Sequence, residues 1–212
     1  LSIRRQRQMC IRDRPNGGYV KIFGDSPKTG IKRIGYIPQK ESVDWDFPVT
    51  VFDVVLMGRY GYHGWLSRIG KEDRNKASEC LEQVNMLAYA NRPIGNLSGG
   101  QQQRVFLARA LAQESAVYLM DEPFAGVDAV TEKTIISILQ EMKKAGKTLM
   151  VVHHDLASAK EYFDQLLLLN MRKVAYGSVS EVYTHELLQK TYGGKLAVLS
   201  EMATEVAKNA YT

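Results

Sequence analysis

The sequence is poor in cysteine and has no long apolar run. Only two cysteines, Cys10 and Cys80, occur among the 212 residues, which excludes a disulfide framework and agrees with a reducing compartment. A membrane-spanning helix needs roughly 18 apolar residues or more, whereas the run Leu166–Leu169 has only the length of a buried strand. We therefore expect any membrane contact to go through a partner protein.

A basic surface is also missing once the first residues are set aside. The chain is formally +5 at pH 7, and residues 1–14 contribute +4 of this through five arginines and one aspartate. The rest is close to neutral, so we expect no nucleic-acid partner. No apolar segment follows the arginines, as a signal peptide would require. We interpret residues 1–14 as a non-native arm, with a genuine basic arm as the alternative, and residues 201–212 as a frayed tail.

A glycine-rich helix start lies in the middle of the chain. Ser98 and Gln101 have the spacing of a capping box, in which each side chain accepts a hydrogen bond from the other residue's backbone N–H. Gly99 and Gly100 have no side chain to keep an anion away from their backbone N–H groups. The pattern predicts a phosphate-binding turn, and the alternative is an ordinary N-cap followed by a turn.

Two carboxylates follow a short apolar run. Val117–Met120 leads directly into Asp121 and Glu122, which predicts a buried parallel strand that delivers both acids to the carboxyl edge of a sheet, where ligands bind. There, Asp121 would hold Mg²⁺ and Glu122 would orient or deprotonate an attacking water.

Together these segments resemble the ATP-binding subunits of ABC transporters, whose signature sequence reads LSGGQ and whose Walker B strand ends in Asp-Glu-Pro. The resemblance implies an α/β fold of the P-loop NTPase type, with a mainly parallel sheet and a helical subdomain, that binds ATP and Mg²⁺. It also implies that Ser98, Gly99, Gly100 and Gln101 contact the ATP held by a second subunit.

Three further segments are similar to elements of that family. Tyr36–Gln39 resembles the Q-loop, whose glutamine, here Gln39, reaches Mg²⁺ and the γ-phosphate. Phe124–Asp128 resembles the D-loop at the dimer interface, and Asp128 is also a candidate N-cap for the next helix. His154, after the predicted strand Thr148–Val152, matches the switch histidine that contacts the γ-phosphate.

The histidines also allow a transition-metal interpretation. His153, His154 and Asp155 are adjacent, but neighbours on an extended chain point to opposite faces, and no further histidine or cysteine supplies a fourth ligand. His63 and His185 are isolated, which is typical of surface or interface positions.

No Walker A sequence, G-x-x-x-x-G-K-[ST], occurs in the 212 residues. Gly146-Lys147-Thr148 does not qualify, because Glu141 stands at the first glycine position and the triplet precedes a strand. Tyr19–Gly24 alternates like a strand and is similar to the strand that follows the Walker A helix in this family. We therefore expect the N-terminal part of the fold to be missing and the chain alone to be inactive.

The remaining pattern predicts one ABC ATPase domain over residues 15–200, with a helical subdomain over residues 41–97. Other predicted elements are a helix over Glu72–Met86, a core-facing helix carrying Ile135, Ile138, Leu139 and Met142 that stops at Gly146, a hairpin of Gln165–Asn170 with Val174–Tyr176, and a closing helix over Ser180–Thr191.

The passage Val43–Tyr60, directly after the Q-loop, is similar to importers of manganese, zinc or iron. In that family this region receives the permease, so we expect Trp45 and Tyr60 to contact it. The alternative places these aromatics in the core of the helical subdomain, and it fits Phe52 and Leu56.

The resemblance thus implies an ATPase subunit of a metal-ion importer, working as a homodimer or with a paired ATPase subunit. Its partners would be a membrane permease and a separate extracytoplasmic metal-binding protein, and it would lie on the cytoplasmic face of the cell membrane. The alternatives are a soluble ABC ATPase without a transport role, or a catalytically dead interaction subunit.

Overall fold

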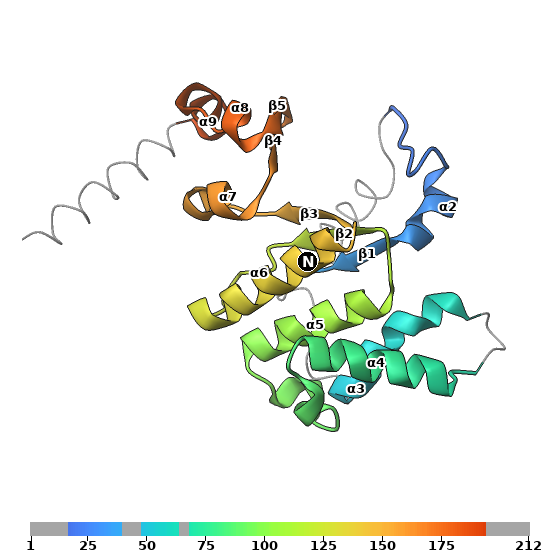
Figure 1. The fold of residues 1–212 in the computed structure, drawn as a ribbon. Helices are drawn as coiled ribbons and strands as arrows, with labels where there is room; N and C mark the ends of the chain where they lie inside the picture. The colour runs from blue at the N-terminus through green and yellow to red at the C-terminus, as the bar shows by residue number, and fades with distance from the viewer. Residues whose placement is uncertain (1–16, 40–47, 64–67, 194–212) are drawn as a thin grey trace, which may run out of the picture. The chain divides into compact units, whose positions relative to one another are not determined.

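The computed structural model describes residues 17–39, 48–63 and 68–193. They belong to two compact units, Leu1–Val152 and His153–Thr212, and each is described by itself. The first unit contains a parallel sheet in the order β1-β2-β3 (Figure 1). Its strands are β1 (Ile34–Ile37), β2 (Val117–Asp121) and β3 (Thr148–Val152). This confirms the predicted fold class and the parallel strand at Val117.

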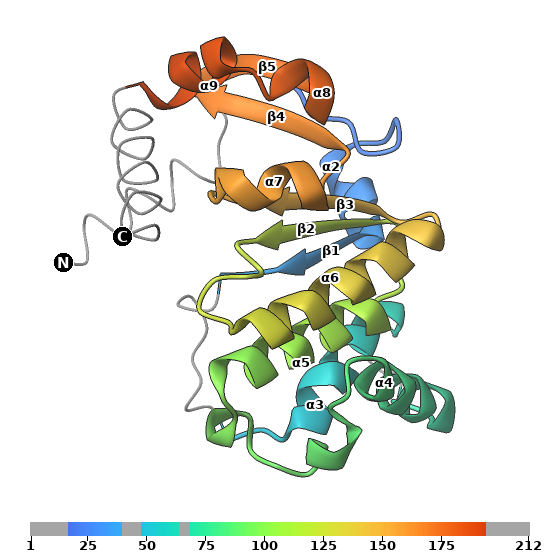
Figure 2. The same ribbon diagram turned by 60° about the vertical axis from the view of Figure 1, so that its left-hand side comes forward.

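Two long helices cover one face of this sheet. Helix α5 (Gly99–Ala112) packs against β1 and α6 (Ala129–Lys144) against β3, and both lie on the same side of the strands (Figure 2). As predicted, α6 presents one apolar face and buries Ile135, Leu139 and Met142. The helix ends at Lys144, and Gly146, with a φ of 75°, turns the chain away just after it. The sheet therefore has one face sealed by helices.

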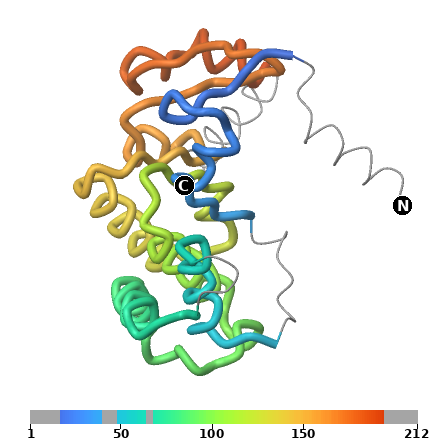
Figure 3. Tube along the Cα trace, turned by 90° about the vertical axis from the view of Figure 1, so that its right-hand side faces the viewer, coloured from blue at the N-terminus to red at the C-terminus, as the bar shows by residue number. Residues whose placement is uncertain are grey.

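Helix α5 lies between the sheet and a second layer of helices. It packs against α3 (Val51–Leu56) and α4 (Lys71–Gln83), which also pack against each other. Figure 3 shows the cyan-to-green segments, residues 51–63 and 68–112, lying together when viewed from a third direction. Contact on both sides explains why most of α5 is buried, including Val105 and Leu107. Each such side chain contributes roughly 1.5–3 kcal/mol relative to an exposed one.

Short helices complete the described part of the first unit. They are α2 (Pro27–Gly30), η1 (Ile31–Arg33), η3 (Met57–Tyr62), η4 (Leu87–Tyr89) and η5 (Ile94–Asn96).

The second unit begins with α7 (Leu156–Tyr162) and contains an antiparallel hairpin. The hairpin consists of β4 (Gln165–Asn170) and β5 (Arg172–Ser178), which confirms the predicted pairing. Met171, at φ 55°, forms the turn. Helices α8 (Val179–Val182) and α9 (His185–Tyr192) follow and pack on both strands.

Three local predictions were wrong. Tyr19–Gly24 is no strand, because Ile22 and Asp25 bond each other across a turn in which Phe23 and Gly24 have positive φ. Leu166–Leu169 is a strand but not a buried one, since only Leu168 is buried and a two-stranded hairpin leaves its other face exposed.

The predicted closing helix is two helices, since the chain leaves helical geometry at Tyr183 and Thr184 caps α9 by accepting from the N–H of Leu187 at 3.4 Å.

Candidate functional site

The acidic pair and the glutamine meet at one edge of the sheet. In the parallel register Ile37 is paired with Met120, so the residues that follow them lie side by side at the carboxyl ends of the strands. Gln39 Nε2 donates a hydrogen bond to Glu122 Oε2 at 3.2 Å. The structure thus brings together two residues that the sequence suggested for one site.

The backbone at Glu122 makes this contact possible. Glu122 has a φ of 49°, a left-handed conformation that is uncommon for residues other than glycine. Its N–H donates to the carbonyl of Val152 at 3.1 Å, and its carbonyl accepts from the N–H of Ala125 at 3.1 Å. Such a conformation costs on the order of 1–3 kcal/mol and is held only where the surroundings fix it. Here the neighbouring strand and the following turn fix the carboxylate at the sheet edge.

Ser98 and Gln101 form the predicted capping box at the start of α5. Gln101 Oε1 accepts from the N–H of Ser98 at 2.9 Å, and Ser98 Oγ accepts from the N–H of Gln101 at 3.4 Å. The N–H groups of the first helical turn, including those of Gly99 and Gly100, have no acceptor within an α-helix. Such N–H groups are the donors that anions use at helix starts, and the role of this turn at a phosphate stays a prediction.

Asp128 caps α6, and Thr131 joins this cap to the glycine turn. Asp128 Oδ1 accepts from the N–H groups of Val130 and Thr131 at 3.0 Å, and Oδ2 accepts from the Thr131 hydroxyl at 2.7 Å. These bonds, first those from Thr131, lower the pKa of Asp128. A Cβ on Gly100 would lie 3.0 Å from Thr131 Cγ2. The N-cap prediction is confirmed, and no spacing in the sequence signalled the role of Thr131.

His154 belongs to the second unit and directly precedes the start of α7. Its neighbour His153 lies with Nε2 2.8 Å from Ser158 Oγ. Asp155 caps α7 by accepting from the N–H of Ala157 at 2.9 Å, and its bond from the Ser158 hydroxyl lowers its pKa. The role of His154 at the γ-phosphate stays a prediction.

Of the two aromatics expected to contact a permease, Trp45 lies outside the described residues. Tyr60, on η3, is 54% exposed. The core interpretation holds for Leu56, which is buried, and Phe52 packs partly against the core.

His63 is bound rather than isolated, which the sequence did not reveal. Its Nε2 lies 2.9 Å from Asp73 Oδ2, and Arg59 Nε donates to the other oxygen of Asp73 at 3.1 Å. The N–H of Gly70 donates to Asp73 as well. Chiefly through Gly70, and then through His63 and Arg59, the pKa of Asp73 falls from 3.8 to about 2.

Within residues 17–39, 48–63 and 68–193, no three histidine, cysteine or acidic side chains gather as a metal site. Mg²⁺ needs no such cage, because it commonly takes one or two carboxylates together with waters and the phosphates of a nucleotide. An acid at the end of β2, Asp121, and the nearby Gln39–Glu122 pair are oxygen donors of the kind it binds.

A parallel sheet that collects an acidic pair and a glutamine at one edge, with a capped, glycine-containing helix start in the same unit, is the arrangement of a nucleotide-binding α/β protein. Residues 7–125 match the family described as ABC transporter. The chain belongs to this family, as one of its ATP-binding proteins.

The chain is also similar to named ATP-binding proteins of metal transport systems. The manganese transport system ATP-binding protein MntB of Bacillus subtilis is 56% identical over 184 residues, 87% of this chain and 74% of that protein. The zinc transport system ATP-binding protein TroB of Treponema pallidum is 54% identical, over 85% of this chain and 68% of that protein.

Solved structures of ABC transporters and their ATP-binding cassettes also match the fold. A metal-chelate type ABC transporter described in an inward-facing conformation matches with a TM-score of 0.69 and 28% identity, over 76% of this chain and 63% of that one. A dimeric ATP-binding cassette bound to ADP and Pi matches with a TM-score of 0.64 and 29% identity, over 78% of this chain and 75% of that one.

Among the helices in the described part of the chain, none has the length and apolar character needed to cross a membrane.

Proposed function

We propose that this chain is the ATP-hydrolysing subunit of an importer for manganese or zinc ions. The observation that carries the proposal is the contact of Gln39 with Glu122 at the edge of a parallel sheet. The names of the relatives from Bacillus subtilis and Treponema pallidum support the choice of ions. Neither name supports a soluble ATPase without a transport role.

Each site residue has a proposed part in hydrolysis. Glu122 orients the attacking water and takes its proton, and Gln39 holds the Glu122 carboxylate and reports on the γ-phosphate. Asp121 and Gln39 would hold Mg²⁺, which neutralises charge that develops on the phosphates. His154 contacts the γ-phosphate of the same nucleotide.

The glycine turn acts on a second nucleotide. Ser98, Gly99, Gly100 and Gln101 would close on the γ-phosphate of ATP held by the opposite subunit, with Asp128 at the interface between them. Closure of this dimer would drive a permease, which is supplied with ions by an extracytoplasmic metal-binding protein. The subunit would then lie on the cytoplasmic face of the membrane, with residues 41–97 as its helical subdomain.

The test uses an extended form of the chain that carries a Walker A sequence ahead of residue 15. Assembled with a permease in vesicles, it should couple ATP hydrolysis to uptake of Mn²⁺ or Zn²⁺. Vesicles with the Glu122→Gln variant should bind ATP and take up no ions. Hydrolysis that is never accompanied by uptake of either ion would support a non-transport ATPase, and absence of ATP binding would support an interaction subunit.

A further inference from the structure

The guanidinium of Arg59 joins three elements that are distant in the sequence. From η3 it reaches Asp73 on α4, with Nε 3.1 Å from Oδ1. Its Nη1 donates to the carbonyl of Ala112 at 2.9 Å and to Glu114 Oε2 at 2.7 Å. The Arg59 side chain is only 13% exposed. Such a bond network in a nearly closed site holds its members more tightly than a surface ion pair does.

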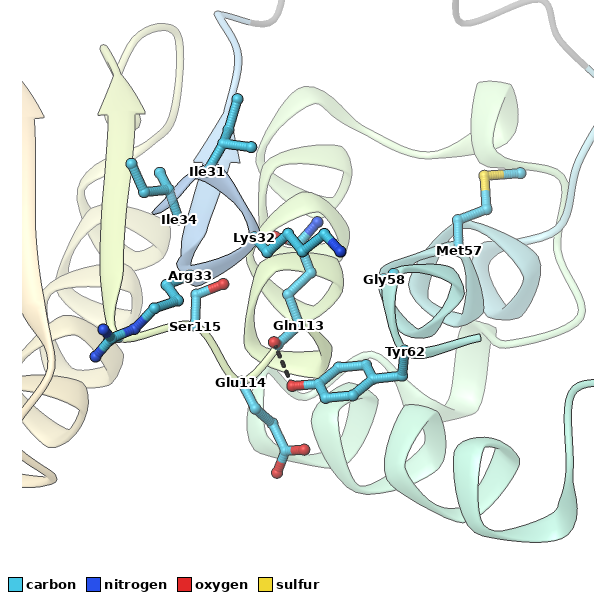
Figure 4. A pocket seen from close by; sticks show the side chains of 12 residues that line it. Ile31, Lys32, Arg33, Ile34, Met57, Gly58, Tyr62, Gln113, Glu114 and Ser115 are labelled. Carbon is cyan, nitrogen blue, oxygen red and sulfur yellow. Dashed lines mark hydrogen bonds between the residues drawn. The ribbon is translucent and has the colours of Figure 1, made fainter. Parts of the chain in front are cut away.

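The partners of Arg59 are themselves fixed. Glu114 also binds Lys76 of α4 at 3.0 Å, and these two cations lower its pKa, Lys76 first. The Arg59 guanidinium stacks on the ring of Tyr62, 4.1 Å from its centre. The Tyr62 hydroxyl in turn donates to the carbonyl of Gln113 at 2.7 Å (Figure 4). Among the described residues, the contacts of Arg59 outside η3 thus lead to α4 and to the end of α5.

The backbone of η3 touches the same helix end. A Cβ on Gly58 would lie 2.4 Å from the carbonyl oxygen of Arg109 and 3.1 Å from Ala112 Cβ. Only glycine allows this approach. The carbonyls of a last helical turn have no partner within the helix, and a cation there is favourable. Gly58 and Arg59 therefore clamp η3 onto the C-terminal turn of α5.

A cavity lies beside this contact, lined by Gly58 and Tyr62 of η3 and by residues 113–116 after α5. It has a volume of about 480 Å³ and separates η3 from residues 31–34, which precede and begin β1 (Figure 4). Toward residues 31–34, η3 is not packed solidly, so it has space to shift in that direction. A shift of η3 is passed on where η3 is bonded, at the end of α5.

The opposite end of α5 carries the Ser98 capping box. An α-helix of this length is ~21 Å long, so a tilt of ~5° about its clamped end moves its start by about 2 Å. Tyr60, the residue after Arg59, is 54% exposed. The short helix η3 thus exposes the ring of Tyr60 to solvent and is bonded to α5, the helix that begins at the glycine turn.

We propose that Arg59 is a positioning residue that sets the orientation of α5 and transmits a partner's contact at η3 to the glycine turn at Ser98. The inference rests on the proposed function, because it needs a permease seated near Tyr60. Arg59 touches no residue that we place at the nucleotide.

The experiment measures ATPase activity of the extended form with and without its permease. We expect Arg59→Lys and Arg59→Gln to lower the ratio of stimulated to basal kcat by about fivefold or more, while the KM for ATP changes less than about twofold. Lysine keeps the charge but cannot span Asp73, Ala112 and Glu114 with one planar group. Arg74→Gln is the matched control, because Arg74 lies exposed on α4 beside Asp73, and it should leave the ratio unchanged.

A merely structural role would lower the stimulated and basal rates in proportion, and that result would overturn the proposal. An unchanged ratio in both Arg59 variants would overturn it as well. If Arg59→Gln does not fold, the milder Arg59→Lys variant decides. If the proposed function itself is wrong, the unsubstituted subunit will show no stimulation by the permease. That result differs from both outcomes above, in which the unsubstituted subunit is stimulated.

Discussion

The side chains of Gln39 and Glu122 are joined by a hydrogen bond of 3.2 Å, although 83 residues separate them in the chain. The bond links the segment after β1 to the end of β2. Any movement of the segment that carries Gln39 will therefore shift the Glu122 carboxylate or break this hydrogen bond. This makes Glu122 the first residue to test.

Replacing Glu122 by glutamine in the extended form should abolish turnover but leave ATP binding intact. The amide keeps the shape of the side chain and loses the negative charge that orients the water and accepts its proton. A positioned general base is worth roughly 10²–10⁴ in rate. Steady-state ATPase assays and nucleotide titrations measure the two properties separately.

Glu141→Gln is the control, because Glu141 is an exposed acid on α6. It should retain full turnover. A Glu122→Gln variant that keeps more than about a tenth of the rate would place the base elsewhere.

Substituting Trp45 or Tyr60 by alanine should weaken stimulation by the permease more than it lowers basal activity. Tyr60 is exposed on η3, and Trp45 falls in the passage that precedes it. Tyr19→Ala, which removes another exposed ring, should not change stimulation. An equal loss of basal and stimulated rates would show that the two aromatics serve the core instead.

Gly58→Ala should destabilise the chain by about 1–3 kcal/mol, the usual cost of overpacking. The added methyl would press on the carbonyl of Arg109, which is backbone and cannot move aside easily. Gly61 lies on the same helix, and a Cβ there would meet nothing within 4 Å. Gly61→Ala should therefore leave urea unfolding nearly unchanged. Equal midpoints for the two variants would contradict the close packing of η3 on α5.

Acid should weaken the contribution of Asp73 to stability. Its pKa is lowered from 3.8 to about 2 in the folded chain, so its stabilisation is complete above pH ~4 and is lost as the pH falls toward 2. Asp73→Asn should be clearly less stable than the unsubstituted chain at pH 6, and this difference should shrink between pH 4 and 2. Urea unfolding at several pH values measures it.

Glu72, the exposed neighbour of Asp73, provides the control. Glu72→Gln should leave the stability nearly unchanged at every pH, because the bonds from Gly70, His63 and Arg59 go to Asp73. A difference between Asp73→Asn and the unsubstituted chain that stays constant down to pH 2 would mean that charge on Asp73 does not matter.

The sequence was informative where chemistry is local. Ser98 and Gln101 lie three residues apart, and Asp128 stands at the start of the next helix, so helix geometry fixes both caps. The acids after Val117–Met120 were predictable for a similar reason, because a strand delivers the residues that follow it to the sheet edge.

Long-range contacts were not predictable from one sequence. Arg59 and Glu114 are 55 residues apart, and no spacing relates them. The positive φ of Glu122 likewise comes from its bond to Val152 on the next strand. Tyr19–Gly24 shows the opposite failure, since its alternation is that of a strand but Ile22 and Asp25 bond each other across a turn.

We propose that the glycine turn of one subunit completes the ATP site of another. The 212 residues contain no Walker A sequence, so we predict that the chain alone hydrolyses no ATP. The most direct measurement mixes it with the extended form in which Ser98 is replaced by arginine, a protein that should also be inactive by itself. The mixture should regain ATPase activity from one composite site, and the chain carrying Ser98→Arg should restore none. A mixture that forms dimers, shown by sedimentation, and stays inactive would mean that the glycine turn does not act on the ATP of the opposite subunit.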